Sequence, residues 1–149
     1  MQESKFCADI IQIVDFRIIK GQIESPFEFD MSAIEGHTFN VEFQMGFNIQ
    51  QALVKADFTV FVETKSSVSI PEEAKGSFHF VYTFHVENLE ELVFYNAKKT
   101  LDVDVNLGNA LAAISHSTSR GVLMTRFQGT ALESFIMPII DPKKLLNVE

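Results

Sequence analysis

The chain of 149 residues has a single cysteine, Cys7, and no tryptophan. One cysteine cannot form an internal disulfide bond, and it gives a zinc site too few thiolate ligands. The four histidines do not compensate for this, because the two on one predicted strand face, His79 and His85, lie about 20 Å apart along the strand. We therefore predict no metal site and no cofactor.

Basic clusters are also scarce, since the net charge is −8 and adjacent basic residues occur only at 98–99 and 143–144. Proteins that bind nucleic acids or anionic membranes normally present a basic surface. No apolar run approaches the roughly 20 residues of a membrane helix. The first residues include Asp9 and Asp15, so they lack the apolar centre of a signal peptide. We expect a cytoplasmic protein that neither binds nucleic acid nor inserts into a membrane.

Motifs that carry catalysis are missing as well. The chain has no GxGxxG and no GxxxxGK phosphate loop. The stretch "DVDVNLGNALAA" from Asp102 fails as a calcium loop, because Leu107 replaces the glycine at its sixth position and Ala113 the glutamate at its twelfth. Ser115 and His116 are adjacent, but no nucleophile elbow accompanies them. We therefore predict a non-enzymatic protein without catalytic residues.

Phenylalanine is abundant instead, with 15 residues, and hydrophobic residues make up 46% of the chain. A chain of this length and composition can bury one substantial core, so we predict a single domain over residues 1–149. Much of the apolar content alternates with polar residues. In "FNVEFQMGFNIQ", residues 39–50, every second residue is Phe, Val, Met or Ile. Such alternation indicates a strand with one buried and one solvated face.

Three further segments have strand character. Residues 11–25 form the first, with a change of apolar parity between Ile13 and Val14 that is typical of a bulge. A connection rich in turn formers is expected at 27–38. Alternating runs at 54–64 and 77–86 follow, and the parity switch places a turn near 48–51. Four strands with short links predict an antiparallel sheet.

Helical signals appear only in the last third of the chain. Asn106 and Asn109 are candidate N-caps of a helix that we expect to end at Arg120, before Gly121. Asp141 followed by a proline predicts a second, short helix. Strands first and helices last indicate an α+β fold, a four-stranded antiparallel sheet followed by one long and one short C-terminal helix. One helix of about 21 Å covers roughly half of one sheet face, so apolar surface should remain for another copy or a bound molecule.

The C-terminal sequence "SRGVLMTRFQGTALESFIMPIIDPKKLL", read with the strands before it, resembles the SecB family of secretion chaperones. In that family a long helix ends in a Ser-Arg-Gly turn, which residues 119–121 match. A Leu-x-Pro-Ile-Asp segment leads into the short last helix, and residues 137–141 match it with one extra residue. Residues 24–26, Glu-Ser-Pro, resemble the Glu-Ala-Pro that closes the family's first strand.

The resemblance implies an ATP-independent chaperone, a holdase that binds unfolded or precursor polypeptides for protein export. It further implies a homotetramer, a dimer of dimers, that passes its clients to the translocase motor SecA. On this basis Glu24 would contact SecA, and the helix residues Ala110, Ala113 and Ser117 would join the dimers. The apolar client groove would be lined by Phe27, Phe29, Met31, Val41, Phe43, Met45 and Phe47. If so, Phe43 and Met45 should be partly exposed in the free protein.

The sequence departs from the family at the acidic patch that docks the motor. Only Glu24 has a counterpart in that patch, because the family's acidic position on the fourth strand falls near Ser77 here. Divergent relatives serve toxin–antitoxin systems instead of export, and the chain could serve either. An apolar-ligand-binding or adaptor protein would use the same phenylalanine-rich face. These alternatives remain open from the sequence, as do the identities of the clients.

Overall fold

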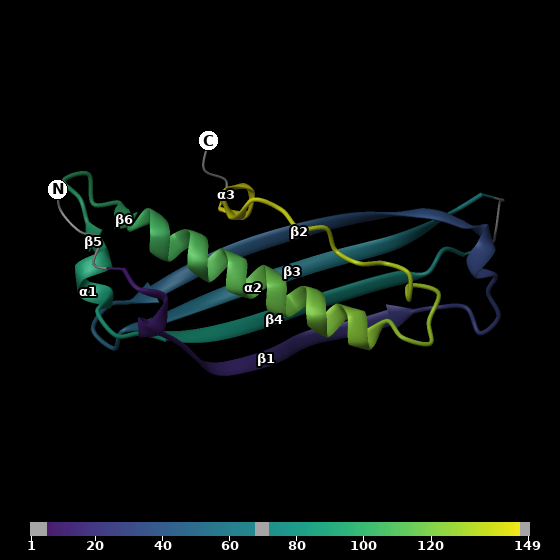
Figure 1. Cartoon of the computed structure of the whole chain (residues 1–149), viewed down its shortest axis with the longest axis horizontal. Helices are drawn as coiled ribbons and strands as arrows, with labels where there is room; N and C mark the ends of the chain where they lie inside the picture. Colours follow the sequence, from purple (N-terminus) through teal and green to yellow (C-terminus); the bar gives the residue numbers. More distant parts are fainter. Residues whose placement is uncertain (1–5, 68–71, 147–149) are drawn as a thin grey trace.

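The computed structural model describes residues 6–67 and 72–146, and its central feature is a four-stranded antiparallel sheet. The strands lie in the order β1-β4-β3-β2, so β1 and β2 form the two edges. Their bounds are β1 (Ile11–Glu24), β2 (Ile34–Asn48), β3 (Leu53–Ser66) and β4 (Lys75–Val86). The helices α2 (Val105–Arg126) and α3 (Pro142–Leu145) follow, and α2 crosses one face of the sheet (Figure 1). The predicted α+β architecture is confirmed.

Shorter elements occupy the ends of the sheet. A 3-10 turn, η1 (Ala8–Ile10), precedes β1, and another, η2 (Met31–Ala33), precedes β2. After β4, the one-turn helix α1 (Leu89–Leu92) leads into an antiparallel hairpin of β5 (Val93–Tyr95) and β6 (Leu101–Val103). The hairpin and the β1–β2 connection lie at opposite ends of the molecule (Figure 1).

The core lies between α2 and the sheet, and strand alternation builds it. Even-numbered residues of β3 and β4 point toward the helix, where Phe58, Phe80 and Tyr82 are fully buried. From above, α2 contributes buried side chains such as Leu111 and Leu123. The buried hydroxyl of Tyr82 is hydrogen-bonded to Ser119 Oγ at 2.6 Å. Burial raises the pKa of Tyr82 to about 12, so the phenol stays neutral.

Two strands are less regular than the sequence suggests. The bulge predicted in β1 is present between Ile13 and Asp15, and a second break in register occurs between Ile18 and Lys20. β2 begins at Ile34, five residues before the predicted start at Phe39, so the expected connection over 27–38 is too long. A register shift between Ile34 and Gly36 interrupts the alternation there, which hides this part of the strand from the sequence pattern.

The long helix also differs from expectation at both ends. Its N-cap is Asp104, whose carboxylate accepts hydrogen bonds from the backbone N–H groups of Asn106 and Leu107, so neither Asn106 nor Asn109 caps it. It continues through Gly121 to Arg126 because burial of Leu123 against the sheet outweighs the roughly 1 kcal/mol that an internal glycine costs. The predicted N-cap of the short helix is confirmed, since Asp141 accepts from Lys143 N–H.

Candidate functional site

The connection between β1 and β2 borders an apolar hollow of about 470 Å³, which we name the loop hollow. Its apolar lining is Pro26, Phe29, Ala33, Ile34, Ala74 and Ala131, and acidic residues stand at its margin. Asp30 caps η2 by accepting hydrogen bonds from the hydroxyl and backbone N–H of Ser32, and these bonds lower the pKa of its carboxyl. The loop is therefore a locally ordered structure that holds apolar side chains in an accessible place.

Three of the predicted groove residues belong to this connection. Phe27 is 98% exposed, Phe29 lines the loop hollow and is also exposed, and Met31 is half-buried in η2. Phe27 and Phe29 are therefore open to solvent, and Met31 is partly so.

The β2 residues of the predicted groove lie on the sheet face that carries the helices. Val41, Met45 and Phe47 are half-buried there. Phe43 is only 9% exposed, more buried than we expected, because its ring packs edge-on against Phe58 with ring centroids 6.3 Å apart. Phe43 is thus largely a core residue whose outer part reaches a surface.

That surface is a second hollow, of about 490 Å³, which we name the edge trough. Its lining comes from the middle of β2, from the residue before the N-cap of α3 and from the end of α3: Val41, Glu42, Phe43, Gln44, Ile140, Lys144 and Leu145. Phe29 lines the loop hollow while Val41 and Phe43 line the edge trough, so the structure divides the predicted groove residues between two places.

The C-terminal segment, residues 134–141, was not among the predicted site residues, yet it connects these surfaces. The Phe135 ring contacts the rings of His37 and Phe39, with centroids 5.2 and 5.5 Å away. The ring nitrogen Nε2 of His116 donates to the Pro138 carbonyl oxygen at 2.9 Å, which fixes the segment between α2 and β2. Ile139, by contrast, is 85% exposed. The apolar run "FIMPII", residues 135–140, is the sequence feature that could have indicated this segment.

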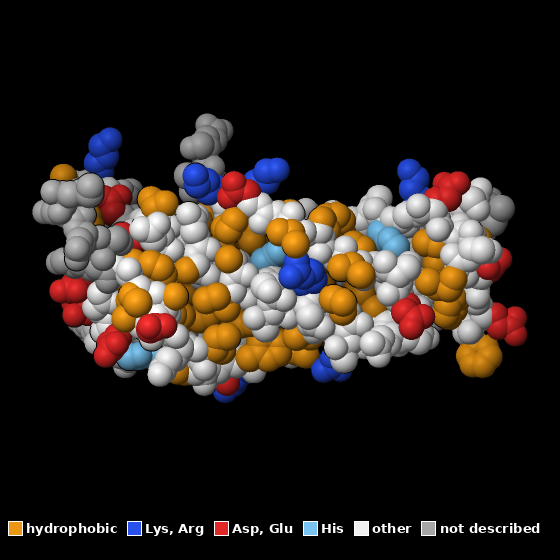
Figure 2. All heavy atoms as spheres, viewed as in Figure 1, with side chains coloured by type: hydrophobic (Ala, Val, Ile, Leu, Met, Phe, Trp, Pro, Cys, Tyr) orange, Lys and Arg blue, Asp and Glu red, His pale blue; other side chains and the backbone are white. Residues whose placement is uncertain are grey.

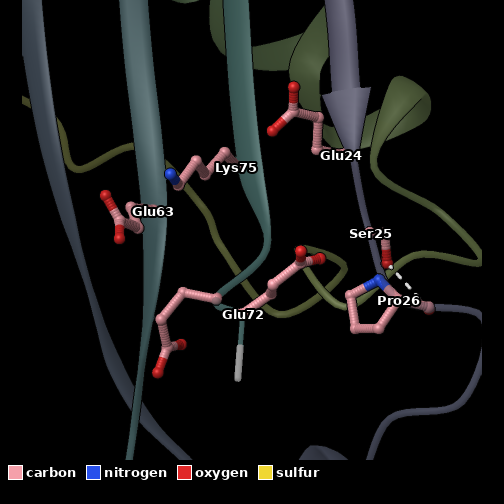
Figure 3. Close-up of a pocket in the computed structure, with 7 residues that line it drawn as sticks. Glu24, Ser25, Pro26, Glu63, Glu72 and Lys75 are labelled. Atoms are coloured by element: carbon pink, nitrogen blue, oxygen red, sulfur yellow. Dashed lines mark hydrogen bonds between the residues drawn. The ribbon is translucent and has the colours of Figure 1, made fainter. Parts of the chain in front are cut away.

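Glu24, the predicted docking residue for SecA, lies at the end of β1 and is not isolated. It lines an acidic hollow of about 620 Å³ with Glu63, Glu72, Glu73 and Lys75. Figure 3 shows Glu24, Glu63, Glu72 and Lys75 around a common opening. Glu24 and Glu63 flank Lys75 on neighbouring strands. Glu73 accepts hydrogen bonds from Thr64 Oγ1 and from Ser66, and the bond from Thr64 is the main cause of its lowered pKa. The sequence could not reveal this cluster, because its members come from three segments.

The predicted oligomer residues lie on the outer side of α2, where Ala113 and Ser117 are exposed and Ala110 is half-buried. The structure adds a larger apolar surface along β1. Its exposed members are Ile13, Val14, Phe16 and Ile19. Figure 2 shows hydrophobic side chains along the margin of the molecule where β1 runs.

Within residues 6–67 and 72–146, no helix is long and apolar enough to cross a membrane. The same residues contain no group of three or more His, Cys, Asp or Glu side chains placed to hold a metal ion.

The fold has a counterpart among solved structures. A SecB-like chaperone of Mycobacterium tuberculosis, in complex with a peptide from an antitoxin, is 14% identical to this chain. The similarity covers 89% of this chain and 92% of the chaperone, with a TM-score of 0.56. The architecture of the chain is therefore SecB-like. No protein-family model and no curated protein matches the chain in sequence.

Proposed function

We propose that the protein is an ATP-independent chaperone that holds unfolded polypeptides on exposed apolar surfaces, without catalysis. One observation carries the proposal: the core beneath α2 is complete, yet Phe27, Phe29 and Ile139 remain exposed beside the hollows. Apolar contact is non-directional, so such a surface accepts many sequences. The likeness in fold to a chaperone that binds a peptide supports the same reading.

The assembly that we propose is a homotetramer of about 67 kDa, four times the 16.8 kDa of the chain. The apolar residues of the β1 margin would contact a second copy, because an exposed apolar strand edge is otherwise prone to uncontrolled association. The small exposed residues Ala113 and Ser117 would allow two α2 helices to approach closely when dimers pair. The tetramer would then leave the loop hollow and the edge trough to clients.

We further propose two alternatives for the clients, export or an antitoxin system. For export, the acidic hollow around Glu24 would dock SecA, and Glu24→Lys should weaken this contact while leaving client binding intact. An antitoxin as client is the second candidate, favoured by the peptide bound to the structural neighbour. We place the protein in the cytoplasm in either case.

The test of the chaperone function compares two pairs of exposed aromatic residues. Phe27→Ser with Phe29→Ser removes apolar area beside the loop hollow, and the matched control, Phe94→Ser with Tyr95→Ser, removes similar area from the hairpin at the other end. We expect the first pair to weaken binding of a denatured model client by about 2 kcal/mol, or roughly thirtyfold. The control should bind like the wild type, and all four side chains are exposed, so both variants should fold.

The measurement is suppression of client aggregation, with binding followed by fluorescence anisotropy. Equal losses in the two variants would mean that the loop hollow has no special role. A wild-type protein that neither binds the client nor suppresses its aggregation would contradict the chaperone function. A stable monomer that retains an apolar small molecule through purification would favour a ligand-binding protein instead.

A further inference from the structure

The C-terminal segment, residues 134–141, is held in place mainly by side chains. Phe135 and Met137 are buried, whereas Ile139 is exposed. Within the described part of the chain, the backbone of residues 136–140 makes no hydrogen bond to another backbone group. Segments with few backbone hydrogen bonds open at a smaller free energy than the core. Loss of a few side-chain contacts should therefore release this segment without unfolding the sheet.

Two histidines from different elements contact this segment. His116 of α2 donates from Nε2 to the Pro138 carbonyl oxygen, and the His37 ring of β2 packs edge-on against the Phe135 ring. The other ring nitrogen of His116, Nδ1, is buried and has no hydrogen-bond partner among the residues that the structure describes. The same is true of Nε2 of His37. Each ring thus has one enclosed nitrogen without a partner.

The enclosed nitrogens favour the neutral form of both rings. In neutral imidazole one nitrogen donates and the other carries a lone pair, whereas in the protonated ring both nitrogens carry a proton. Protonation would therefore place a charged N–H group where neither an acceptor nor water reaches it, and burying such a group is costly. Once the segment has moved away, water can accept the hydrogen bond. Proton uptake and release of the segment are thus coupled.

The surroundings of His116 contain one charged group that acts on it. Burial and, to a smaller extent, the positive charge of Arg120 on the same helix lower the pKa of His116. The side chain that β3 places beside it is the uncharged ring of Phe58. The charged residues of the segment and of α3 are exposed: Asp141, Lys143 and Lys144.

The surroundings of His37 oppose its protonation through enclosure alone. Burial lowers the pKa of His37. Its partner across the strand pair, Thr64 of β3, is uncharged, and the Thr64 hydroxyl donates to Glu73. Glu35, on the same strand as His37, is exposed. The remaining contact is the Phe135 ring of the segment itself.

We propose that the C-terminal segment is an acid-released strap, which His37 and His116 hold in place at neutral pH and free when they take up protons. In the released chain both histidines have an ordinary pKa of 6.5, so release is favoured as the pH falls below that value. Release would expose Phe135 and Met137 while the core beneath α2 stays intact. The protein would then present more apolar surface in acid than at neutral pH. This inference goes beyond the proposed chaperone function and does not depend on it.

The experiment measures release through the reactivity of a thiol in the strap. In a Cys7→Ser background, Met137→Cys places the thiol at a buried position, and Ile139→Cys gives an exposed reference in the same segment. Both proteins react with a pyridyl disulfide between pH 7 and pH 5. The ratio of the two rates cancels the pH dependence of the thiol itself and reports the released fraction. We expect this ratio to rise about tenfold or more over that range, since two protons allow at most a hundredfold change per pH unit.

The two histidines are tested by replacements that keep their contacts but cannot be protonated. His116→Gln retains an N–H donor for Pro138, and His37→Phe retains a ring beside Phe135. Each should remove part of the rise, and the double variant should keep a rate ratio constant within about twofold. The matched control is His85→Gln, on the sheet face opposite α2, which should behave like the wild type. If circular dichroism shows that His116→Gln is unfolded, His37→Phe alone decides.

Three results would overturn the strap. The first is a rate ratio that stays constant from pH 7 to pH 5, and the second is a rise that survives replacement of the histidines. The third concerns Val60→Cys, a thiol in the core of the sheet. If it becomes reactive with the same pH dependence as the thiol in the strap, the whole chain unfolds and no strap is released. Client binding is measured at neutral pH, so the chaperone function stands or falls independently of these results.

Discussion

The two edges of the sheet hold equivalent positions in the topology but differ in almost every other respect. β1 is broken by two register shifts and carries Arg17 and Lys20, features that oppose regular pairing with another strand. Its apolar side chains are nevertheless exposed. From Gly36 to Asn48, β2 pairs regularly with β3 and has one carboxylate, Glu42, and no Lys or Arg, and α3 forms a wall beside it.

The difference indicates two modes of recognition. The β1 margin has exposed apolar side chains and an irregular backbone. It suits a partner of fixed shape, such as a second copy, because side-chain packing then sets the specificity. A regular backbone edge in a trough suits partners that share nothing but a peptide chain. Under the proposed function, the β1 margin would provide a specific assembly and the β2 edge would provide unspecific client binding.

The largest expected effect is the loss of assembly when the β1 margin is changed. Ile13→Asp with Ile19→Asp would place two carboxylates where we propose that a second copy packs, and both side chains are about half exposed in one chain. Each lost apolar contact is worth roughly 1.5–3 kcal/mol, so the assembly should weaken more than a hundredfold. Light scattering should show the 67 kDa species replaced by a smaller one.

Its control is Phe61→Asp, which changes an exposed aromatic residue of β3 on the sheet face opposite the helix. That variant should keep the wild-type mass. A wild-type protein that is monomeric at micromolar concentration, or a double variant that stays fully assembled, would show that β1 is not an interface.

The second prediction compares two glycines of the sheet, one beneath the residues that follow α2 and one on the opposite face. Next to β1, the strand β4 contains Gly76, and a Cβ atom there would lie 2.9 Å from the Phe127 ring and 3.1 Å from Leu132. Gly76→Ala should therefore cost about 1–3 kcal/mol of unfolding free energy, because the core cannot admit an extra methyl group.

The contrasting change is Gly46→Ala in β2, on the sheet face opposite α2, where an added Cβ would meet no atom within 4 Å. It should be neutral or slightly stabilising, since alanine restricts the unfolded chain. Urea unfolding of both variants gives the comparison. Equal destabilisation would mean that the β2 edge is packed as tightly as the β4 interior.

The strands and the fold class could be predicted from the sequence because a half-buried strand leaves a local period of two. The start of β2 could not, since the register shift before Gly36 removes that period. The end of α2 was missed because a glycine signal is local, while burial of Leu123 depends on the sheet. The same holds for the site. The exposure of Phe27 is consistent with its place in a connection between strands, but the burial of Phe43 depends on Phe58 of the neighbouring strand. Ile140 is a trough residue only because α3 lies beside β2.

The smallest expected effect is a pH dependence confined to the β2 side. Burial lowers the pKa of His37, and burial together with the positive charge of Arg120 lowers the pKa of His116, both from an ordinary value of 6.5. The two histidines contact the C-terminal segment at Phe135 and Pro138, whereas β1 contains no histidine.

Because both pKa values are lower in the folded chain than in the unfolded one, the stability that depends on neutral histidine is complete above about pH 6.5 and declines as the pH falls through the lowered values. Asp30 and Glu73, whose pKa values are also lowered, follow the same direction but at more acidic pH, below their ordinary values of 3.8 and 4.5. Lowering the pH from 7 to 5 should therefore reduce amide protection factors, which correct for the intrinsic exchange rate at each pH, in β2 and the C-terminal segment before those in β1. His37→Phe, which keeps an aromatic ring beside Phe135 but cannot be protonated, should reduce this response. Protection factors that fall equally on both edges would show that the histidines do not act on the β2 side alone.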